Sequence, residues 1–579
     1  MRHTRLAIMR ADATGAPLMS DRKTGPRKPL LALAAVSVGA CALAASTWHV
    51  FGHTWDEPEH IAAGLALIDH GHYDYDIQHP PLARLALAVG PYLAGARSQG
   101  KPPPDGKPEG LAVLYGSGHY ELYLTLARAG ALPFLALLVL VTYAWARRVL
   151  GPWESVLAAG LLATTPAVLG HGALATLDVP AAATCLLALL ALQRWLDART
   201  VGRALALGLA AGLAIGSKLS ALPFLGLGGF ALAACGRHPT RAGPRAPPTA
   251  TTRQLLLAAV VAGALLALAY GGRIIYLTDA TQRYNPALGY LFGYAGPVHD
   301  AAYALAARLP VPEAFQLIVG GIEALSYHNH TGHLSYLLGE MRTSGWWYFY
   351  IVALAAKTPL PLLALGITGL ALLARDGWRG QPQRLALPAL FVVLLGFVSA
   401  FSRINIGVRH VLVLYPLLAI GAALALRRAW HALTAMRAGA LTYAGTAGLS
   451  ALMVWQLVTV ARCWPDYLPY FNELIAAPRA VLVDSDLDWG QDLKRLSRRL
   501  HELGVPALSL AYQGTADLAR ESLPPFVRLA PDQRATGWIA ITELARVRAP
   551  RRFDWLDAYT PRATVGRTIE LYYIPLETR

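Results

Sequence analysis

The sequence predicts a polytopic α-helical membrane protein that carries a small soluble α/β domain at its carboxyl end. Hydrophobic residues make up 55% of the 579-residue chain and charged residues 15%, whereas soluble domains carry about 25% charge. Uncharged apolar runs such as 134–144 and 385–400 recur along the chain, and a transmembrane helix needs roughly 20 mostly apolar residues. After residue 461 the pattern changes to short apolar alternations, which are typical of strands.

The amino-terminal segment 1–28 is basic and precedes an apolar run over 29–50. Its positive charges are Arg2, Arg5, Arg10, Arg22, Lys23, Arg27 and Lys28. The apolar run is too long for a signal-peptide core and lacks a clear small-residue cleavage site. We therefore predict an uncleaved first span, preceded by a basic cytoplasmic segment.

Length and apolarity predict about eleven spans. Their approximate limits are 29–50, 123–146, 153–171, 178–196, 201–216, 218–236, 254–276, 347–374, 385–402, 409–427 and 438–461. If the amino terminus is cytoplasmic, five basic connections fall on the cytoplasmic side, namely 147–148, 194–203, 236–253, 375–384 and 427–437. The positive-inside rule predicts this distribution, and it accounts for the net charge of +16, so we expect no nucleic-acid partner.

The opposite side receives the loops 51–122 and 277–346 and the tail 462–579. The transmembrane domain is thus predicted over 29–461. The apolar stretch 82–93 is too short to span a bilayer, so we predict a helix lying in the membrane interface. A re-entrant segment is the alternative interpretation.

The tail is predicted to form a small α/β domain outside the cytoplasm, because apolar alternation and helical periodicity follow one another. The predicted elements are a strand over 479–486, an amphipathic helix over 490–504, and strands over 507–514, 536–542 and 569–575.

Acidic residues stand at the predicted outer face. The stretch "TWDEPEH" places Asp56 and Glu57 directly after the first span, in a loop crowded with His, Tyr and Asp. Asp178 begins the fourth span on the same face. An acid that ends one helix, or an N-cap followed by Pro180, would also account for these positions.

Cations also gather at this outer boundary, against the positive-inside tendency. Lys218 lies at the tip of a helical hairpin, and Arg403, Arg409 and His410 lie in "FSRINIGVRHVLVLYP". Inserting an Arg or Lys at membrane depth costs roughly 2.5–3.5 kcal/mol, and such charges indicate function by default. We therefore predict an anionic partner, such as a lipid phosphate; snorkelling is the alternative for Lys218.

Five stretches together resemble the polyprenol-phosphate-dependent glycosyltransferases of the GT-C class, in particular the bacterial protein O-mannosyltransferase-like proteins of glycosyltransferase family thirty-nine. They are "TWDEPEHIAAG" with "HPPLARLALA", "LATLDVPAAA", "GLAIGSKLSALP", "GWWYFYIVALAAKTPLPLL" and "INIGVRHVLVLYP". The resemblance implies a GT-C type fold in which Asp56 is the catalytic base, supported by Glu57. It also implies a substrate-binding set of Asp178, Lys218, Arg409, His410, Arg403, His79 and Arg84.

One position departs from relatives of this class. The aminoarabinose-transferase relatives carry Lys-Pro-Pro-Leu where this chain begins the same motif with His79. A neutral imidazole donates one hydrogen bond but supplies no permanent positive charge.

The resemblance implies a single displacement that inverts the anomeric carbon. The sugar passes from a polyprenyl-phosphate donor to a hydroxyl of a protein, lipid or glycan acceptor, with Asp56 taking the proton. The resemblance and the Ala/Arg-rich composition imply a multi-pass protein of a bacterial inner membrane, in contact with its lipids. A transporter or flippase for a polyprenyl-linked or anionic substrate is the alternative, but a transporter carries its ionisable residues near the bilayer midplane.

Two further clusters leave metal binding open, and we assign no metal ligand. The acidic stretch "DSDLDWGQDL" (484–493) fits either a divalent cation, as a possible cofactor, or a turn that caps the following helix. The loop residues His328, His330 and His333 have a composition that also suits a metal ion.

Overall fold

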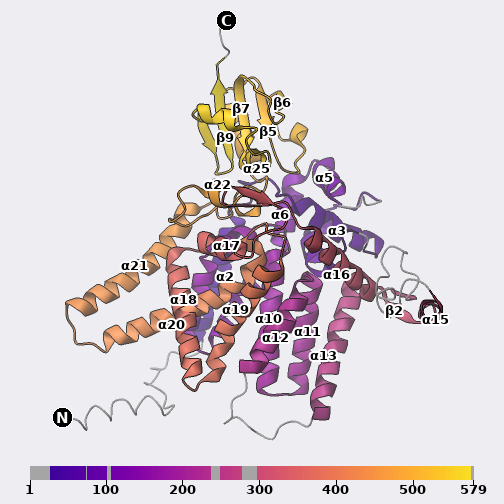
Figure 1. The fold of residues 1–579 in the computed structure, drawn as a ribbon, viewed down its shortest axis with the longest axis vertical. Helices are drawn as coiled ribbons and strands as arrows, with labels where there is room; N and C mark the ends of the chain where they lie inside the picture. Colours follow the sequence, from indigo (N-terminus) through magenta and orange to yellow (C-terminus); the bar gives the residue numbers. More distant parts are fainter. Residues whose placement is uncertain (1–26, 74, 101–105, 236–247, 277–295, 576–579) are drawn as a thin grey trace.

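A computed structural model of the chain describes residues 27–73, 75–100, 106–235, 248–276 and 296–575. The fold is mostly helical, with a small sheet stacked at one end of the helical bundle (Figure 1). Most of the predicted basic segment 1–28, much of the connection 236–253 and part of the loop 277–346 lie outside the described residues.

In these ranges, eight segments are long and apolar enough to cross a membrane. They are α2 (Arg27–Ala45), α6 with α7 (Tyr120–Ala146), α10 (Asp178–Asp197), α13 (Pro248–Ala269), α18 (Leu360–Trp378), η2 with α19 (Pro382–Phe401), η3 with α20 (Val408–Thr434) and α21 (Ala440–Cys463). Each corresponds to one of the eleven predicted spans, so the chain is a multi-pass membrane protein.

The other three predicted spans are shorter or bent. The predicted span 153–171 is a pair of helices, α8 (Pro152–Ala163) and α9 (Pro166–Gly172), which meet at 66°. The predicted spans 201–216 and 218–236 are the short helices α11 (Val201–Ser217) and α12 (Ala221–Cys235).

Two predicted span limits also change. The span 347–374 is interrupted at Thr358-Pro359, where α17 (Phe349–Lys357) ends and α18 begins, because the residue before a proline disfavours helical backbone. The end of the span 254–276 is strand β1 (Ile274–Tyr276), since Gly271 adopts φ +96° and terminates α13.

Short helices and two two-stranded sheets form the described parts of the loops 51–122 and 277–346. The helices are α3 (Glu57–His70), α4 (Pro81–Leu93), α5 (Lys107–Gly116), α15 (Pro297–Ala306) and α16 (Glu313–Thr331). Strand β1 pairs antiparallel with the distant β2 (Pro310–Pro312), and β3 (Ser335–Leu337) forms a hairpin with β4 (Glu340–Arg342).

The predicted interfacial stretch 82–93 is the helix α4, and its position relative to a membrane stays a prediction. It packs against α3, α6 and α11. The backbones of α3 and α4 approach so closely that a Cβ on Gly64 would lie 2.3 Å from the carbonyl oxygen of Arg84. This contact fixes the position of α3, at whose start the predicted catalytic acids stand.

The carboxy-terminal cap (478–574) contains a five-stranded sheet of order β6-β5-β7-β9-β8. Its strands are β5 (Leu508–Ala511), β6 (Phe526–Arg528), β7 (Gly537–Thr542), β8 (Ala563–Val565) and β9 (Ile569–Ile574). Strand β5 is parallel to β6 and β7, and β9 is antiparallel to its neighbours. The cap also contains α22 (Pro478–Val481), α23 (Asp484–Leu487), α24 (Leu493–Glu502), η4 (Leu518–Arg520), α25 (Glu543–Arg548) and η5 (Asp554–Ala558).

Most of the elements predicted for the tail are confirmed. The helix 490–504 is α24, and the strands 507–514, 536–542 and 569–575 are β5, β7 and β9. The predicted strand 479–486 is wrong, because the short helices α22 and α23 occupy this stretch.

Candidate active site

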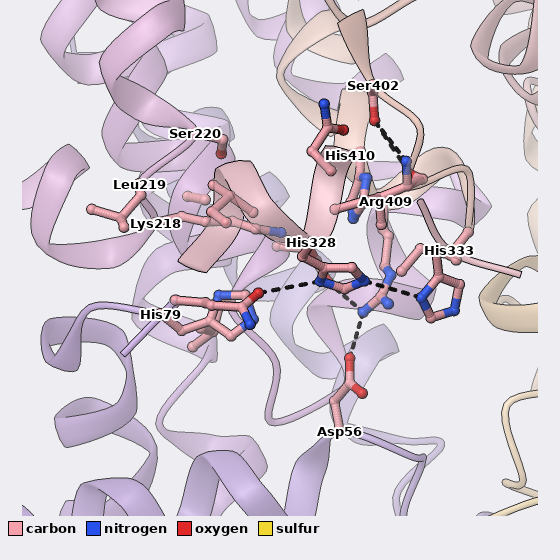
Figure 2. Close-up of a pocket in the computed structure, with 18 of the residues that line it drawn as sticks. Asp56, His79, Lys218, Leu219, Ser220, His328, His333, Ser402, Arg409 and His410 are labelled. Carbon is pink, nitrogen blue, oxygen red and sulfur yellow. Dashed lines mark hydrogen bonds and ion pairs between the residues drawn. The ribbon is translucent and has the colours of Figure 1, made fainter. Parts of the chain in front are cut away.

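A cavity of about 860 Å³ lies where the loops 51–122 and 277–346, the ends of the long helices and the cap meet. Six of the nine predicted site residues line it, and Figure 2 shows five of these as labelled sticks. The six are Asp56, His79, Asp178, Lys218, Arg409 and His410. Residues far apart in the sequence are thus brought to one site.

Four of these residues form a chain of alternating charges. A carboxylate oxygen of Asp56 lies 2.7 Å from Nη1 of Arg409, and the same nitrogen lies 3.7 Å from Asp178. The second oxygen of Asp178 accepts a hydrogen bond of 2.7 Å from Nζ of Lys218. Asp178 is almost fully buried, whereas a quarter of the Asp56 side chain is exposed. The most accessible carboxylate is therefore the one predicted to take a proton.

Helix ends place these side chains. Asp56 directly precedes α3 but makes no side-chain capping bond. Asp178 is the first residue of α10, whose N-cap is Leu177, and its carboxylate binds Lys218 instead of the helix start. The capping interpretation of Asp178 is therefore wrong. Lys218 follows α11 and pairs with an acid, which argues against snorkelling.

Glu57 lies behind the cavity and does not line it. Its side chain is fully buried and binds Arg128 through both oxygens, at 2.8 Å and 2.9 Å. The same carboxylate accepts backbone hydrogen bonds from Thr54 and Ala175. Burial raises the pKa of Glu57, but Arg128 and these hydrogen bonds hold it below its ordinary value. Glu57 therefore fixes the loop that carries Asp56 instead of facing substrate.

Two of the predicted cations also lie away from the cavity. Arg84 is fully buried and bonded to Asp76 at 2.8 Å and to His60 at 3.2 Å. Arg403 is exposed, and its guanidinium donates to the carbonyl of His330 at 3.1 Å. The resemblance implied that both side chains bind substrate, but neither of them lines the cavity.

His79 lines the cavity as a neutral group. Burial lowers its pKa to about 4, with Asp76 acting in the opposite direction and Arg84 and Lys218 adding to the effect. At neutral pH the imidazole therefore offers a hydrogen bond and no charge.

In the two clusters that the sequence left open for metal binding, the side chains contact other protein groups. Nε2 of His328 lies 3.3 Å from Nδ1 of His333, and Nδ1 of His328 lies 3.2 Å from Gln78. His330 is exposed. In the ranges that the structure describes, no group of three His, Cys, Asp or Glu residues is arranged to hold a metal ion.

The four acids of the stretch 484–493 diverge. Asp486 accepts from the backbone of Val408 at 3.0 Å, and Asp488 accepts from that of Leu544 at 2.7 Å. Asp492 accepts from Thr568 at 2.7 Å, and Asp484 binds Arg548 at 3.3 Å. Separate partners for each carboxylate argue against a shared cation, and two of the four carboxylates bind backbone N–H groups of other segments.

The strap (484–492) holds both members of the Asp56–Arg409 pair, a connection that sequence reasoning missed. The backbone N–H groups of Gly52 and Trp55 donate to the carbonyls of Gln491 and Trp489, at 3.0 Å and 3.1 Å. The guanidinium carbon of Arg409 stands 4.3 Å from the ring centroid of Trp489, a cation–π contact. The cap therefore contributes to the geometry of the site.

The cavity has two kinds of wall. Its apolar wall comes from α12, α16 and α19, and includes Leu222, Phe224, Leu325, Phe397, Val398 and Phe401. Its polar wall carries the charged residues and four residues of the cap, namely Asp484, Trp489, Leu544 and Arg548.

A comparison with family models finds a match to part of the chain. Residues 125–263 match the family model described as dolichyl-phosphate-mannose-protein mannosyltransferase. Over this part of the chain, the match confirms the resemblance that the sequence motifs indicated. A search of curated proteins finds no significant match.

Three solved structures are similar to the chain. ArnT from Cupriavidus metallidurans bound to undecaprenyl phosphate has 14% identity and a TM-score of 0.43, over 94% of this chain and 97% of that one. The apo oligosaccharyltransferase of Archaeoglobus fulgidus has 16% identity and a TM-score of 0.41, over 83% and 58%. The S. cerevisiae protein O-mannosyltransferase Pmt1–Pmt2 complex bound to the sugar donor has 18% identity and a TM-score of 0.32, over 42% and 33%. The chain thus spans little more than half of the archaeal enzyme's length.

Proposed function

We propose that the chain is an inverting glycosyltransferase that moves a sugar from a polyprenyl-phosphate donor to an acceptor hydroxyl on the outer face of a bacterial inner membrane. One observation carries the proposal: Asp56, Arg409, Asp178 and Lys218 form an alternating charge chain on a cavity with one apolar wall. Such a site offers a proton acceptor, cations for a phosphate and an apolar surface for a lipid.

Asp56 is the general base. Its Oδ2 is held by Arg409, and among the described residues Oδ1 has no hydrogen-bond partner. As the acceptor oxygen attacks the anomeric carbon, Oδ1 takes the hydroxyl proton, and the bond from the sugar to the phosphate breaks. One displacement inverts the anomeric centre and needs no covalent sugar intermediate, unlike the double displacement of retaining glycosidases.

Lys218 and Arg409 stabilise the leaving group. Asp178 lies between them and fixes their positions before the donor arrives. Charge develops on the phosphate oxygen as its bond to the sugar breaks, and cations already in place stabilise it without reorganisation. His410 and the neutral His79 lie on the same wall and supply hydrogen bonds.

The apolar wall suits a polyprenyl chain. Phe224 belongs to α12, and Phe397 and Phe401 belong to α19, so a donor held at Lys218 can extend its prenyl tail over these rings. The basic connections on the other side support a cytoplasmic amino terminus and a cap outside the cytoplasm.

A transporter or flippase fits the site less well. Lys218 and Arg409 lie beside the ends of their helices, and Asp178 begins α10. Transport sites lie near the bilayer midplane, on helices that are broken there.

The test is sugar transfer by purified protein from radiolabelled polyprenyl-phosphate sugars to candidate acceptors. Because general-base catalysis contributes about 10²–10⁴-fold, we expect Asp56→Asn to lower the rate by at least about 10²-fold. Asp532→Asn is the matched control, since this acid is exposed on the cap and pairs with Arg552. Equal transfer by Asp56→Asn and wild type would remove Asp56 from the mechanism, and absence of transfer from every donor would refute the proposed function.

A further inference from the structure

The cap contributes two charged side chains to the polar wall that the proposed reaction leaves unused, Asp484 and Arg548. We propose that this pair forms the acceptor subsite and that the acceptor is a saccharide, bound through neighbouring hydroxyl groups. The inference rests on the proposed glycosyltransferase function and names the class of its second substrate.

The pair is open to a ligand. Nη2 of Arg548 lies 3.3 Å from Oδ2 of Asp484, and the two side chains are 25% and 20% exposed. A guanidinium carries five N–H donors, and the described residues accept a single hydrogen bond from that of Arg548. Oδ1 of Asp484 accepts from the N–H of Ser485 at 2.8 Å, but its side chain is still partly exposed. By contrast, Asp486, Asp488 and Asp492 are almost fully buried.

The backbone holds Asp484 in an unfavourable conformation. Its φ of +41° lies in the left-handed region, which non-glycine residues rarely adopt. Both following residues are anchored, because Ser485 donates to the carbonyl of Ile406 and Asp486 accepts from Val408. Strained residues concentrate at ligand-binding and catalytic sites, which agrees with a carboxylate held toward the cavity.

The pair lines the same cavity as the proposed general base Asp56 and contacts the residue that precedes it. The guanidinium carbon of Arg548 stands 5.6 Å from the ring centroid of Trp55, which immediately precedes Asp56. Trp55 lines the same cavity, as does His333. Burial lowers the pKa of His333, and the charges of Asp484 and Arg548 are among those that act on it. An acceptor bound to the pair therefore presents its hydroxyl on the side of the cavity where Asp56 stands.

The chemistry of the pair favours a saccharide over a peptide or a phospholipid. Adjacent sugar hydroxyls each donate and accept, so one can donate to the Asp484 carboxylate while its neighbour accepts from Arg548. A serine or threonine side chain has one hydroxyl and uses only half of this pattern. An ionised acceptor phosphate accepts hydrogen bonds but donates none, so it would use Arg548 and leave the Asp484 carboxylate without a donor.

The test uses full-length protein, a polyprenyl-phosphate sugar that it accepts as donor, and methyl α-D-mannopyranoside and methyl α-D-glucopyranoside as acceptor probes. An acetylated peptide amide with one serine is the competing probe. Two variants change the pair: Asp484→Asn, because asparagine tolerates the left-handed backbone, and Arg548→Gln. We expect the KM for the methyl glycosides to rise about tenfold or more in each variant, since hydrogen bonds to charged groups are lost. The donor KM should change less than about threefold.

Arg552→Gln is the matched control, because this exposed arginine of the cap pairs with Asp532 and does not line the cavity. We expect this variant to have the wild-type KM for the methyl glycosides and for the donor. An unchanged glycoside KM in both pair variants, or transfer to the serine peptide and not to the glycosides, would overturn the proposal. If the wild-type protein transfers sugar from no donor, this result refutes the proposed function but does not test the acceptor subsite. Equilibrium dialysis of the labelled glycosides against the same variants then tests the subsite, and equal binding by wild type and variants, or no binding at all, overturns it.

Discussion

Two adjacent carboxylates at the start of α3 have different tasks. Asp56 faces the cavity and pairs with Arg409, whereas Glu57 is buried against Arg128. The helical rotation between neighbouring residues separates them, so one carboxylate is available for chemistry and the other fixes the loop. The two should therefore respond differently to the same substitution.

We expect Glu57→Gln to destabilise the protein. The substitution leaves Arg128 buried without its counter-ion, and breaking a buried pair in this way costs about 3–5 kcal/mol. Thermal unfolding in detergent measures the loss, with Glu502→Gln as the control because it pairs with Arg499 at the exposed surface. An unchanged melting temperature with abolished transfer would instead assign Glu57 to catalysis.

A second prediction at this scale concerns pH. Burial lowers the pKa of His53 to about 4 from an ordinary value of 6.5, and Glu57 only partly opposes this. Between these two pKa values His53 is protonated in the unfolded chain but neutral in the folded chain. The stability linked to His53 is therefore complete above pH 6.5 and is lost as the pH falls toward 4. The loss is roughly 3 kcal/mol at most.

Unfolding midpoints between pH 7 and pH 4 test the role of His53. We expect His53→Asn to flatten part of the slope and the exposed His431→Asn to leave it unchanged. A slope that is identical in His53→Asn and wild type would contradict this assignment.

The sequence allowed us to predict which residues carry the chemistry of the site, but not which residues pair with them. The sequence identified Asp56, Asp178, Lys218 and Arg409 as acids and cations on one face, and the structure brings them together. It did not reveal that Arg128 pairs with Glu57, because such a partnership depends on tertiary packing and not on any local pattern.

At the scale of elements, the strap is the main difference from expectation. The β-branched and apolar run after residue 479 predicts a strand, but α22 and α23 form there. Asp484 binds the N–H of Ser485, and Asp488 binds that of Gly490. Such local side-chain bonds compete with the ladder of a sheet, and Asp486 ties the segment to Val408.

We expect Trp489 to position Arg409. Trp489→Leu removes the aromatic face beneath the guanidinium, so the transfer rate should fall about tenfold or more, while Trp489→Phe, which keeps an aromatic face, should lose less. The control is Trp538→Leu, since this ring contacts Tyr573 within the cap, away from the cavity. Initial rates and melting temperatures of the variants are compared. A rate that falls only in proportion to unfolding, or equal losses in the Phe and Leu variants, would leave Trp489 a purely structural role.

At the scale of the whole molecule, hydropathy predicts which segments are apolar helices but not which helices are long and straight. Hydropathy predicts one span over α8 and α9, because the break at Thr164-Thr165 adds little polarity. In the structure the axes of the two helices meet at 66°. The order of strands in the cap also depends on long-range pairing, which a single sequence does not specify.

The proposed orientation gives a prediction for the intact chain. Backbone hydrogen bonds join the loop before Asp56 to the strap, so both lie on one side of the membrane. We expect alkaline phosphatase fused at the carboxyl end to be active and the same reporter fused between α20 and α21, in the basic connection 427–437, to be inactive. Green fluorescent protein fusions should give the reverse pattern. Activity of both phosphatase fusions, or of the second alone, would contradict the topology.

The two backbone bonds from Gly52 and Trp55 to the strap also bear on biogenesis. The ribosome makes residue 56 long before it makes residues 489–491, so a nascent chain that has already inserted its first helices still lacks the partners that shape its acidic loop. We therefore expect a chain that ends before residue 484 to lack the proposed transfer activity, even if its helices are inserted in the membrane.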